Sequence, residues 1–273
     1  MTNLSIIIAV YNSPEWTKHC LEYIHKYTFS KPFVIVIDNN SRNSTHEMLK
    51  SMRDNNYIDL LLKNEDNMGS HFAWNQGLNY VESKYVSIIH SDCLVSPNWD
   101  SIIIKCLEKD NSMMAASPIT NYSDQFYLRY SQTLFNEYVK IKPNNKSSLS
   151  YNDISYLIDE YYMFDNNFEK FSEKVFNKFK YSFRFLTEMG THCVMFKNHA
   201  LFSLDKFDDE FYPHFGAEKV LLKKMHDRGW DYISCLGSYV HHHGNATSDG
   251  PGFNMPIMLE NSEKLVIKKL SVI

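Results

Sequence analysis

The sequence lacks the short motifs that identify the commonest nucleotide-binding folds. No G-x-G-x-x-G follows its first apolar run, so a Rossmann dinucleotide site is missing its fingerprint. No Walker A sequence occurs, which argues against a P-loop NTPase. The longest apolar run near the start, Ile6 to Val10, is too short to span a membrane, and no basic segment precedes it. We therefore expect a chain without a membrane span or a signal peptide.

Cysteine and positive charge are also scarce. The five cysteines are odd in number and never two residues apart, so neither a disulfide framework nor a zinc ribbon is expected. The 28 Lys and Arg against 32 Asp and Glu give a net charge of −4, which argues against a broadly basic nucleic-acid-binding surface. The 44% hydrophobic and 22% charged fractions are ordinary for a globular protein. These features predict a cytoplasmic α/β protein in a reducing compartment.

The first part of the chain alternates apolar runs with helical periodicity, which is typical of a parallel sheet covered by helices. A helix is expected to begin at Ser13-Pro14, another at a capping box of Ser44 and Glu47, and a third at Ser96-Pro97. A further helix is predicted over about 70–81. The predicted strands cover 5–11, 33–37, 58–62, 85–89 and 113–116.

The rhythm weakens from about 120 to 185, where Tyr, Phe, Asn and Lys are dense and no strand alternation is clear. This stretch predicts a helical or irregular insertion. Beyond it we expect strands over 192–196, 231–236 and 238–241, a helix over 217–228, and a final loop with a short amphipathic helix.

Polar residues interrupt three of the apolar runs where the predicted strands end. They are Tyr11-Asn12, Asp38-Asn39-Asn40 and His90-Ser91-Asp92. Ligands of open α/β sheets bind beyond the carboxyl ends of the strands, so these residues are candidates for a binding site.

Several sequence blocks then carry a resemblance to a known family. They are Ser5–Asn12, Val34–Ser41, Asn64–Gly69 with Asn75 and Gly77, Tyr85–Asp92, Met189–Phe196, Phe207–Tyr212 and Val240–Thr247. In this order they resemble family 2 glycosyltransferases of the GT-A fold. Tyr85–Asp92 stands where that family has a strand ending in its D-x-D motif, with His90 at the first carboxylate position. The chain departs from the family there and before the helix of 217–228.

The resemblance implies an α/β fold of GT-A type, with a Rossmann-like, mostly parallel sheet flanked by helices. Within one continuous domain, residues 1–119 would form the nucleotide-sugar-binding half and 120–187 an aromatic-rich, acceptor-side insertion. Residues 188–249 would form the acceptor and catalytic half, and 250–273 a C-terminal loop and short helix.

The resemblance also implies which residues contact the donor. Asp38 matches the family's aspartate that accepts a hydrogen bond from uracil, although a turn carboxylate held by neighbouring amides would look the same. Tyr11 would pack near the base or within the core, and Asn67, Gly69 and Asn75 could equally be ordinary turn and cap residues. The expected donor-binding residues are Ala9, Tyr11, Asn12, Asp38, Asn40, Asn67, Gly69, Asn75, His90 and Ser91.

Asp92 and His242 are the expected metal ligands. Negative charge accumulates on the departing nucleotide diphosphate, and a divalent cation stabilises it as a Lewis acid. Carboxylate oxygens suit Mn²⁺ or Mg²⁺. His90 could ligate the metal, bond a phosphate or only shape the turn. Among the three consecutive histidines, strand alternation would send His241 and His243 to one face and His242 to the other.

An inverting transfer needs a base for the acceptor hydroxyl. Counted back from Gly229, Glu218 falls where the family carries its catalytic aspartate, and Asp209 is the reserve. A carboxylate that merely stabilises a helix start would also fit Glu218.

The sequence therefore predicts an inverting glycosyltransferase that uses a nucleotide-diphospho-sugar, with UDP favoured, and Mn²⁺ or Mg²⁺. The alternative is a catalytically inactive relative that binds sugar nucleotides or carbohydrate. A nucleotidyltransferase would normally show a glycine-rich basic loop after the first strand, and none is present. The acceptor could be a polysaccharide, a teichoic-acid-like polymer, a protein or a modified nucleobase. The expected location is the cytoplasm or, peripherally, the inner face of the membrane.

Overall fold

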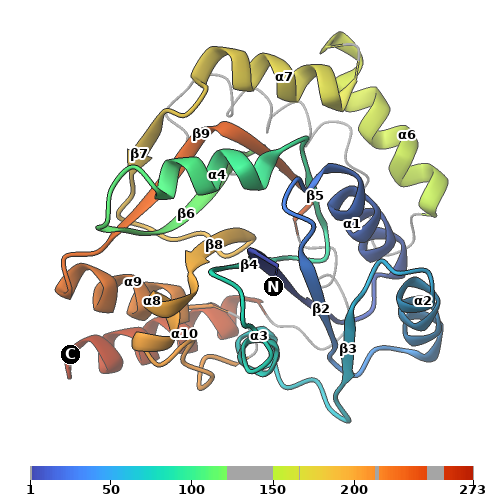
Figure 1. Cartoon of the computed structure of the whole chain (residues 1–273). Helices are drawn as coiled ribbons and strands as arrows, with labels where there is room; N and C mark the ends of the chain where they lie inside the picture. The colour runs from blue at the N-terminus through green and yellow to red at the C-terminus, as the bar shows by residue number, and fades with distance from the viewer. Residues whose placement is uncertain (1, 122–149, 166, 213–214, 245–254, 273) are drawn as a thin grey trace.

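A central sheet separates two layers of helices in the computed structural model, which describes residues 2–121, 150–165, 167–212, 215–244 and 255–272 (Figure 1). The strand order is β3-β2-β1-β4-β8-β6-β9-β5, with β7 also paired to β9. Strands β1 to β4 pair in parallel, whereas β8 runs antiparallel to β4 and β6, and β5 antiparallel to β9. The strands are β1 (Leu4–Val10), β2 (Phe33–Asp38), β3 (Leu60–Lys63), β4 (Tyr85–Ile89), β5 (Cys93–Val95), β6 (Met113–Thr120), β7 (Phe183–Phe185), β8 (Cys193–Lys197) and β9 (Asp231–His242).

The apolar runs become strands because both faces of the sheet are covered. Ile6, Ile7 and Ile8 are all fully buried, as expected where helices lie on both sides of a parallel sheet. The predicted strands are found, with three differences. Strand β3 starts at Leu60, β6 continues to Thr120, and the two stretches predicted after 231 form the single strand β9.

Alternate strand residues point to different helix layers. Ile6 and Ile8 contact the apolar cluster of α1 (Pro14–Tyr27), α2 (Asn43–Asp54) and α4 (Trp99–Leu107). Ile7 contacts the opposite cluster. That second layer contains α3 (Ser70–Leu78), α8 (Asn198–Ser203), α9 (Ala217–Asp227) and α10 (Met255–Leu270).

The described part of the predicted insertion is mostly helical and ends in strand β7, which was not predicted. It contains α6 (Tyr151–Tyr162), a 3₁₀ turn at Met163–Asp165 and α7 (Phe168–Phe179), and residues 122–149 lie outside the described residues. Its aromatic side chains form a third apolar cluster with Trp16 and Tyr239. The insertion is therefore packed onto α1 and β9 as a satellite core.

Two predicted helix starts and one predicted helix cap need correction. Helix α2 begins at Asn43, with Arg42 before it and no side-chain cap, so the capping box is wrong. Helix α1 begins at Pro14 as expected, but Ser13 has a φ of 55° and its side chain does not cap the helix. Helix α4 begins at Trp99, three residues later than Ser96, and is preceded by Asn98 with a φ of 59°. In addition, α10 is a helix of 16 residues and α8 was not predicted.

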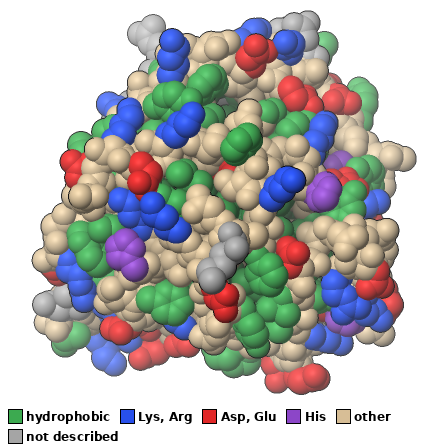
Figure 2. Space-filling model, in the orientation of Figure 1, with side chains coloured by type: hydrophobic (Ala, Val, Ile, Leu, Met, Phe, Trp, Pro, Cys, Tyr) green, Lys and Arg blue, Asp and Glu red, His purple; other side chains and the backbone are tan. Residues whose placement is uncertain are grey.

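The surface agrees with the charge balance of the sequence. On the face in Figure 2, Lys and Arg side chains are interspersed with Asp and Glu side chains. Among the described helices, none has the length and apolar character needed to cross a membrane.

Candidate active site

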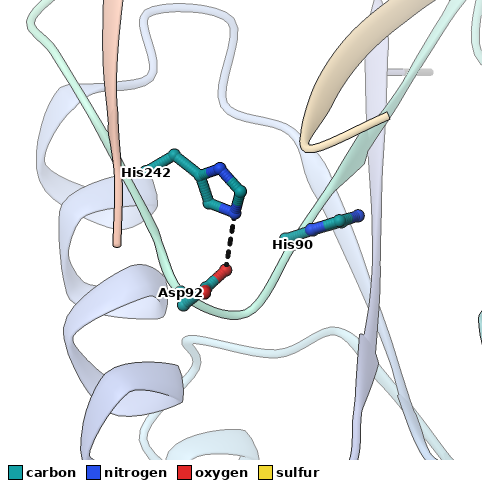
Figure 3. A group of neighbouring side chains, drawn as sticks. All are labelled: His90, Asp92 and His242. Atoms are coloured by element: carbon teal, nitrogen blue, oxygen red, sulfur yellow. Dashed lines mark ion pairs between the residues drawn. The ribbon is translucent and has the colours of Figure 1, made fainter. Parts of the chain in front are cut away.

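The carboxyl end of β4 and the end of β9 bring three potential metal ligands together. Strand β5 turns back beside β9 and pairs Cys93 with His242. Asp92 lies one residue before Cys93, and the side chain of His242 faces it (Figure 3). His90 lies at the start of the same turn. One ligand atom from each of His90, Asp92 and His242 lies within 4.8 Å of the others. The two predicted metal ligands, Asp92 and His242, therefore lie next to each other and next to His90.

This cluster is nearly closed to solvent. The Nε2 atom of His242 lies 3.3 Å from Oδ1 of Asp92, and their side chains are 11% and 8% exposed. Burial alone would raise the pKa of the Asp92 carboxyl, but His242 and His90 hold it below its ordinary value. Burial and the neighbouring His242 lower the pKa of His90 to about 3. The cluster therefore offers a carboxylate and a neutral His90 imidazole, the forms that bind cations.

Two further residues support His242, and the sequence did not single out either one. Asn121 is fully buried, donates from Nδ2 to the His242 carbonyl at 3.1 Å and accepts from the His242 amide at 2.7 Å. The His192 ring stacks on His242 with centroids 5.0 Å apart. Asn121 follows a strand that was predicted four residues too short, so its place beside β9 was not visible in the sequence.

The three consecutive histidines separate as alternation predicted. His241 bonds through Nδ1 to the Tyr162 hydroxyl at 2.8 Å, and His243 stacks on Trp16 at 3.7 Å between centroids. Both aromatic partners belong to the third apolar cluster, whereas His242 faces Asp92. The alternation prediction is confirmed.

Glu218 lies in the first turn of α9 and is partly buried. Its Oε2 accepts from the Gly216 amide at 2.8 Å. Burial raises the pKa of its carboxyl above the ordinary 4.5, although this bond and Lys219 act in the opposite direction. A carboxyl with a raised pKa suits a general base, and the same bond stabilises the helix start. Both readings of Glu218 are compatible with its geometry.

Three consecutive acidic residues, Asp208, Asp209 and Glu210, precede α9, and their surroundings differ. Lys269 of α10 forms ion pairs with Asp208 at 2.7 Å and Glu210 at 2.8 Å. Asp209, the reserve base, is exposed.

The turn after β2 is held largely by its own residues. Asp38 is fully buried, accepts from the Ser41 amide at 2.8 Å and bonds Nδ1 of His46 at 2.7 Å. This arrangement matches the alternative of a turn carboxylate, and a base contact through Asp38 stays a prediction. Asn12 accepts from the Arg42 amide at 3.0 Å, and Asn40 is exposed with a φ of 65°.

The remaining predicted donor residues surround the same sheet edge. Asn67 accepts from the Gly69 amide at 3.1 Å, and Gly69 precedes α3 with a φ of 81°. The Asn75 amide donates to the Phe207 carbonyl at 2.7 Å and accepts from its N–H at 3.2 Å, so it links α3 to the loop before α9. Three further residues follow or end β1 and β4. Ala9 and Tyr11 are partly buried, and Ser91 is buried.

The fold is that of GT-A glycosyltransferases. A mannosyltransferase of Pyrobaculum calidifontis in complex with GDP-mannose and Mn²⁺ aligns with a TM-score of 0.58, at 14% identity, over 92% of this chain and 59% of that chain. GalNAc-T7 with UDP, GalNAc and Mn²⁺ aligns with a TM-score of 0.62, at 14% identity, over 89% of this chain and 44% of that chain. The predicted fold class is confirmed.

The sequence comparison identifies the family. The family described as "Glycosyl transferase family 2" matches residues 5–189, more than half of the chain. This protein therefore belongs to glycosyl transferase family 2, as its sequence blocks indicated. It is 30% identical over 96 residues to an uncharacterized glycosyltransferase of Methanocaldococcus jannaschii, MJ1057. That match covers 34% of this chain and 33% of the relative, so only about a third of the relative's length is aligned.

Proposed function

We propose that this protein is an inverting, metal-assisted glycosyltransferase that moves a sugar from a nucleotide-diphospho-sugar to an acceptor hydroxyl. The observation that carries the proposal is the convergence of His90, Asp92 and His242 at the carboxyl end of β4. Ligands of open α/β sheets bind at this edge, and here it also contains the turns after β1 and β2.

The ligand set fits a divalent cation. Mg²⁺ strongly prefers oxygen ligands, whereas two imidazoles and one carboxylate suit a first-row transition metal. Both structural neighbours were solved with Mn²⁺, which supports Mn²⁺ for this chain. When bound, the cation would stabilise negative charge on the departing diphosphate. His90, Asp92 and His242 would hold it, with Asn121 fixing the backbone of His242.

The other side chains supply binding and proton transfer. The turns that contain Asn12, Asp38 and Asn40 would bind the nucleotide, and Glu218 would accept the proton of the acceptor hydroxyl. UDP is the favoured nucleotide because the sequence resembles UDP-sugar enzymes, although the neighbours include one GDP-mannose complex and one UDP complex.

Thermal-shift measurements of the purified chain test the donor directly. The probes are UDP-glucose, UDP-GlcNAc, UDP-GalNAc and GDP-mannose, each with Mn²⁺, with Mg²⁺ and with a chelator. A donor at about 100 times its Kd stabilises the folded state by roughly 2.7 kcal/mol. We expect a UDP-sugar to raise Tm with Mn²⁺ and to do so far less with a chelator. No shift with any probe would contradict the proposal, and release of UDP separates an enzyme from an inactive binding relative.

A further inference from the structure

The C-terminal helix α10 lies against the turn that precedes Glu218, next to α9 (Figure 1). Its Val266 side chain is 8% exposed and belongs to the same apolar cluster as Ala217 of α9. We infer that α10 is a clamp that positions the Glu218 carboxylate for proton transfer, with Ser262, Val266 and Lys269 as positioning residues. This inference rests on the proposed role of Glu218 as the base.

The clamp contacts Gly216 through the side chain of Val266. Gly216 has a φ of 107°, a conformation that favours glycine, and its amide orients the Glu218 carboxylate. A Cβ added to Gly216 would lie 2.6 Å from the Phe211 ring and 3.0 Å from Cγ2 of Val266. The Val266 side chain therefore packs against Gly216, whose N–H donates to the Glu218 carboxylate.

Two further residues of α10, Ser262 and Lys269, make polar contacts with the part of the chain that precedes Gly216. The Ser262 hydroxyl donates to the Phe215 carbonyl at 3.0 Å, one residue before Gly216. Lys269, whose side chain is only 22% exposed, pairs with Asp208 and Glu210 at the start of the loop. Helix α10 thus contacts Asp208 and Glu210, which follow Phe207, and also Phe215 and Gly216, which directly precede α9.

The opposite side of the loop is held by α3. Nδ1 of His71 bonds the Phe211 carbonyl at 3.1 Å, and the Asn75 amide bonds both backbone groups of Phe207. Helix α3 therefore holds Phe207 and Phe211, whereas α10 contacts Asp208, Glu210, Phe215 and Gly216. Proton transfer depends on placement, because a displacement of about 1 Å can reduce a rate roughly a hundredfold.

The first test measures the Glu218 carboxyl itself and needs no substrate. Glutamate ¹³C-carboxyl NMR titrations are recorded for the wild type, Val266→Ala and Ser262→Ala, with Glu218→Gln to assign the resonance. Opening the turn admits water, so we expect the pKa of Glu218 to move down toward 4.5 in both variants. Ile267→Ala, at a side chain 70% exposed on the same helix, is the matched control and should titrate like the wild type.

The charged groups near this turn could also affect that titration. They are Lys219 on α9, His71 on α3, the Asp208 and Glu210 carboxylates, and Lys269 on α10. Lys269→Met is therefore compared with Lys268→Met, which removes an exposed charge from the same helix turn. Lys269→Arg should restore the wild-type behaviour because it preserves the ion pairs.

The second test separates turnover from donor binding. With Mn²⁺ and whichever UDP-sugar releases UDP fastest, Val266→Ala should lower kcat roughly ten- to a hundredfold. The Kd of UDP should not change, because the contacts described for α10 are with α9 and with Asp208, Glu210, Phe215 and Gly216, whereas the proposed nucleotide-binding turns follow β1 and β2. Ser262→Ala removes one partly buried hydroxyl, so it serves as the test if Val266→Ala fails to fold.

The outcomes distinguish this inference from the proposed function. If Glu218→Gln loses turnover while Val266→Ala and Ser262→Ala keep the wild-type kcat and titration, the clamp is wrong. If Glu218→Gln keeps wild-type turnover, the base itself is misassigned and the proposed function must change.

Discussion

Two regions of the molecule each contain a carboxylate that we propose takes part in the reaction, and the pKa values of these two carboxyls shift in opposite directions. In the turn after β4, Asp92 faces two histidines, which keep its pKa below the ordinary value despite burial. In the first turn of α9, Glu218 has no facing histidine among its named partners, and burial raises its pKa. Groups whose environments push their pKa values apart usually have different chemical roles. This difference supports the roles that we propose, which are cation binding for Asp92 and proton transfer for Glu218.

The largest expected effect comes from removing the base. Glu218→Gln keeps the size of the side chain and its bond to Gly216 but cannot accept a proton. Positioned proton transfer contributes roughly 10²–10⁴ in rate, and we expect a loss of that order in turnover. Tm and the Kd of UDP should stay at their wild-type values. If Glu218→Gln keeps more than about a tenth of wild-type turnover in an assay limited by the chemical step, Glu218 is not the general base.

A smaller effect is expected from the support of the metal cluster. Asn121→Ala removes both bonds to the His242 backbone, while every proposed ligand is retained. Loss of an outer partner of a ligand typically weakens metal affinity about 10–100-fold. Mn²⁺ titration by calorimetry measures this change, and Glu218→Gln is the control that should bind Mn²⁺ normally. Wild-type Mn²⁺ affinity in Asn121→Ala would show that His242 needs no such support.

The pH dependence of turnover should report the ionisation of Glu218, and not that of Asp92 or His90. Glu218 must be ionised to accept a proton, so turnover should fall as the pH decreases through its pKa, which lies above 4.5. His90, with a pKa of about 3, and Asp92 both titrate below that window in the free protein. We expect an acid limb in kcat whose position depends on the side chain at 218. A limb that is unchanged when Glu218 is replaced by Asp would point to another group.

The smallest catalytic effect is expected at the two outer histidines. His241→Ala and His243→Ala remove fully buried rings that contact Tyr162 and Trp16. Aromatic pairs contribute roughly 0.5–1.5 kcal/mol beyond the area they bury, so both variants should have a lower Tm. Mn²⁺ affinity should stay near wild type, in contrast to His242→Ala. Equal losses of Mn²⁺ affinity in all three variants would contradict the separation of the faces.

The sequence revealed much of this site because its signals are local. Apolar runs that end in polar residues predicted β1, β2 and β4, and parallel pairing then brought their ends together. Alternation along β9 separated His242 from its neighbours. The family resemblance supplied the roles that we propose for Asp92 and Glu218.

The rest depends on contacts between distant parts of the chain. Strand β5 has three residues and follows a turn, so its sequence alone resembles a helix approach. The bonds of Asn121 to His242 and of Asn75 to Phe207 each join residues more than a hundred positions apart. No local periodicity encodes such pairs, and the contact of Val266 with the Gly216 turn is hidden for the same reason.

The central claim is that the cluster around Asp92 binds a cation that in turn binds the nucleotide diphosphate. Calorimetric titration of UDP into the wild type and Asp92→Asn, each with Mn²⁺ and with a chelator, tests it most directly. The account predicts tight UDP binding by the wild type only with Mn²⁺, and the loss of that dependence in a folded Asp92→Asn. Equal UDP affinity with and without Mn²⁺ in the wild type, or Mn²⁺-dependent binding retained in Asp92→Asn, would contradict it.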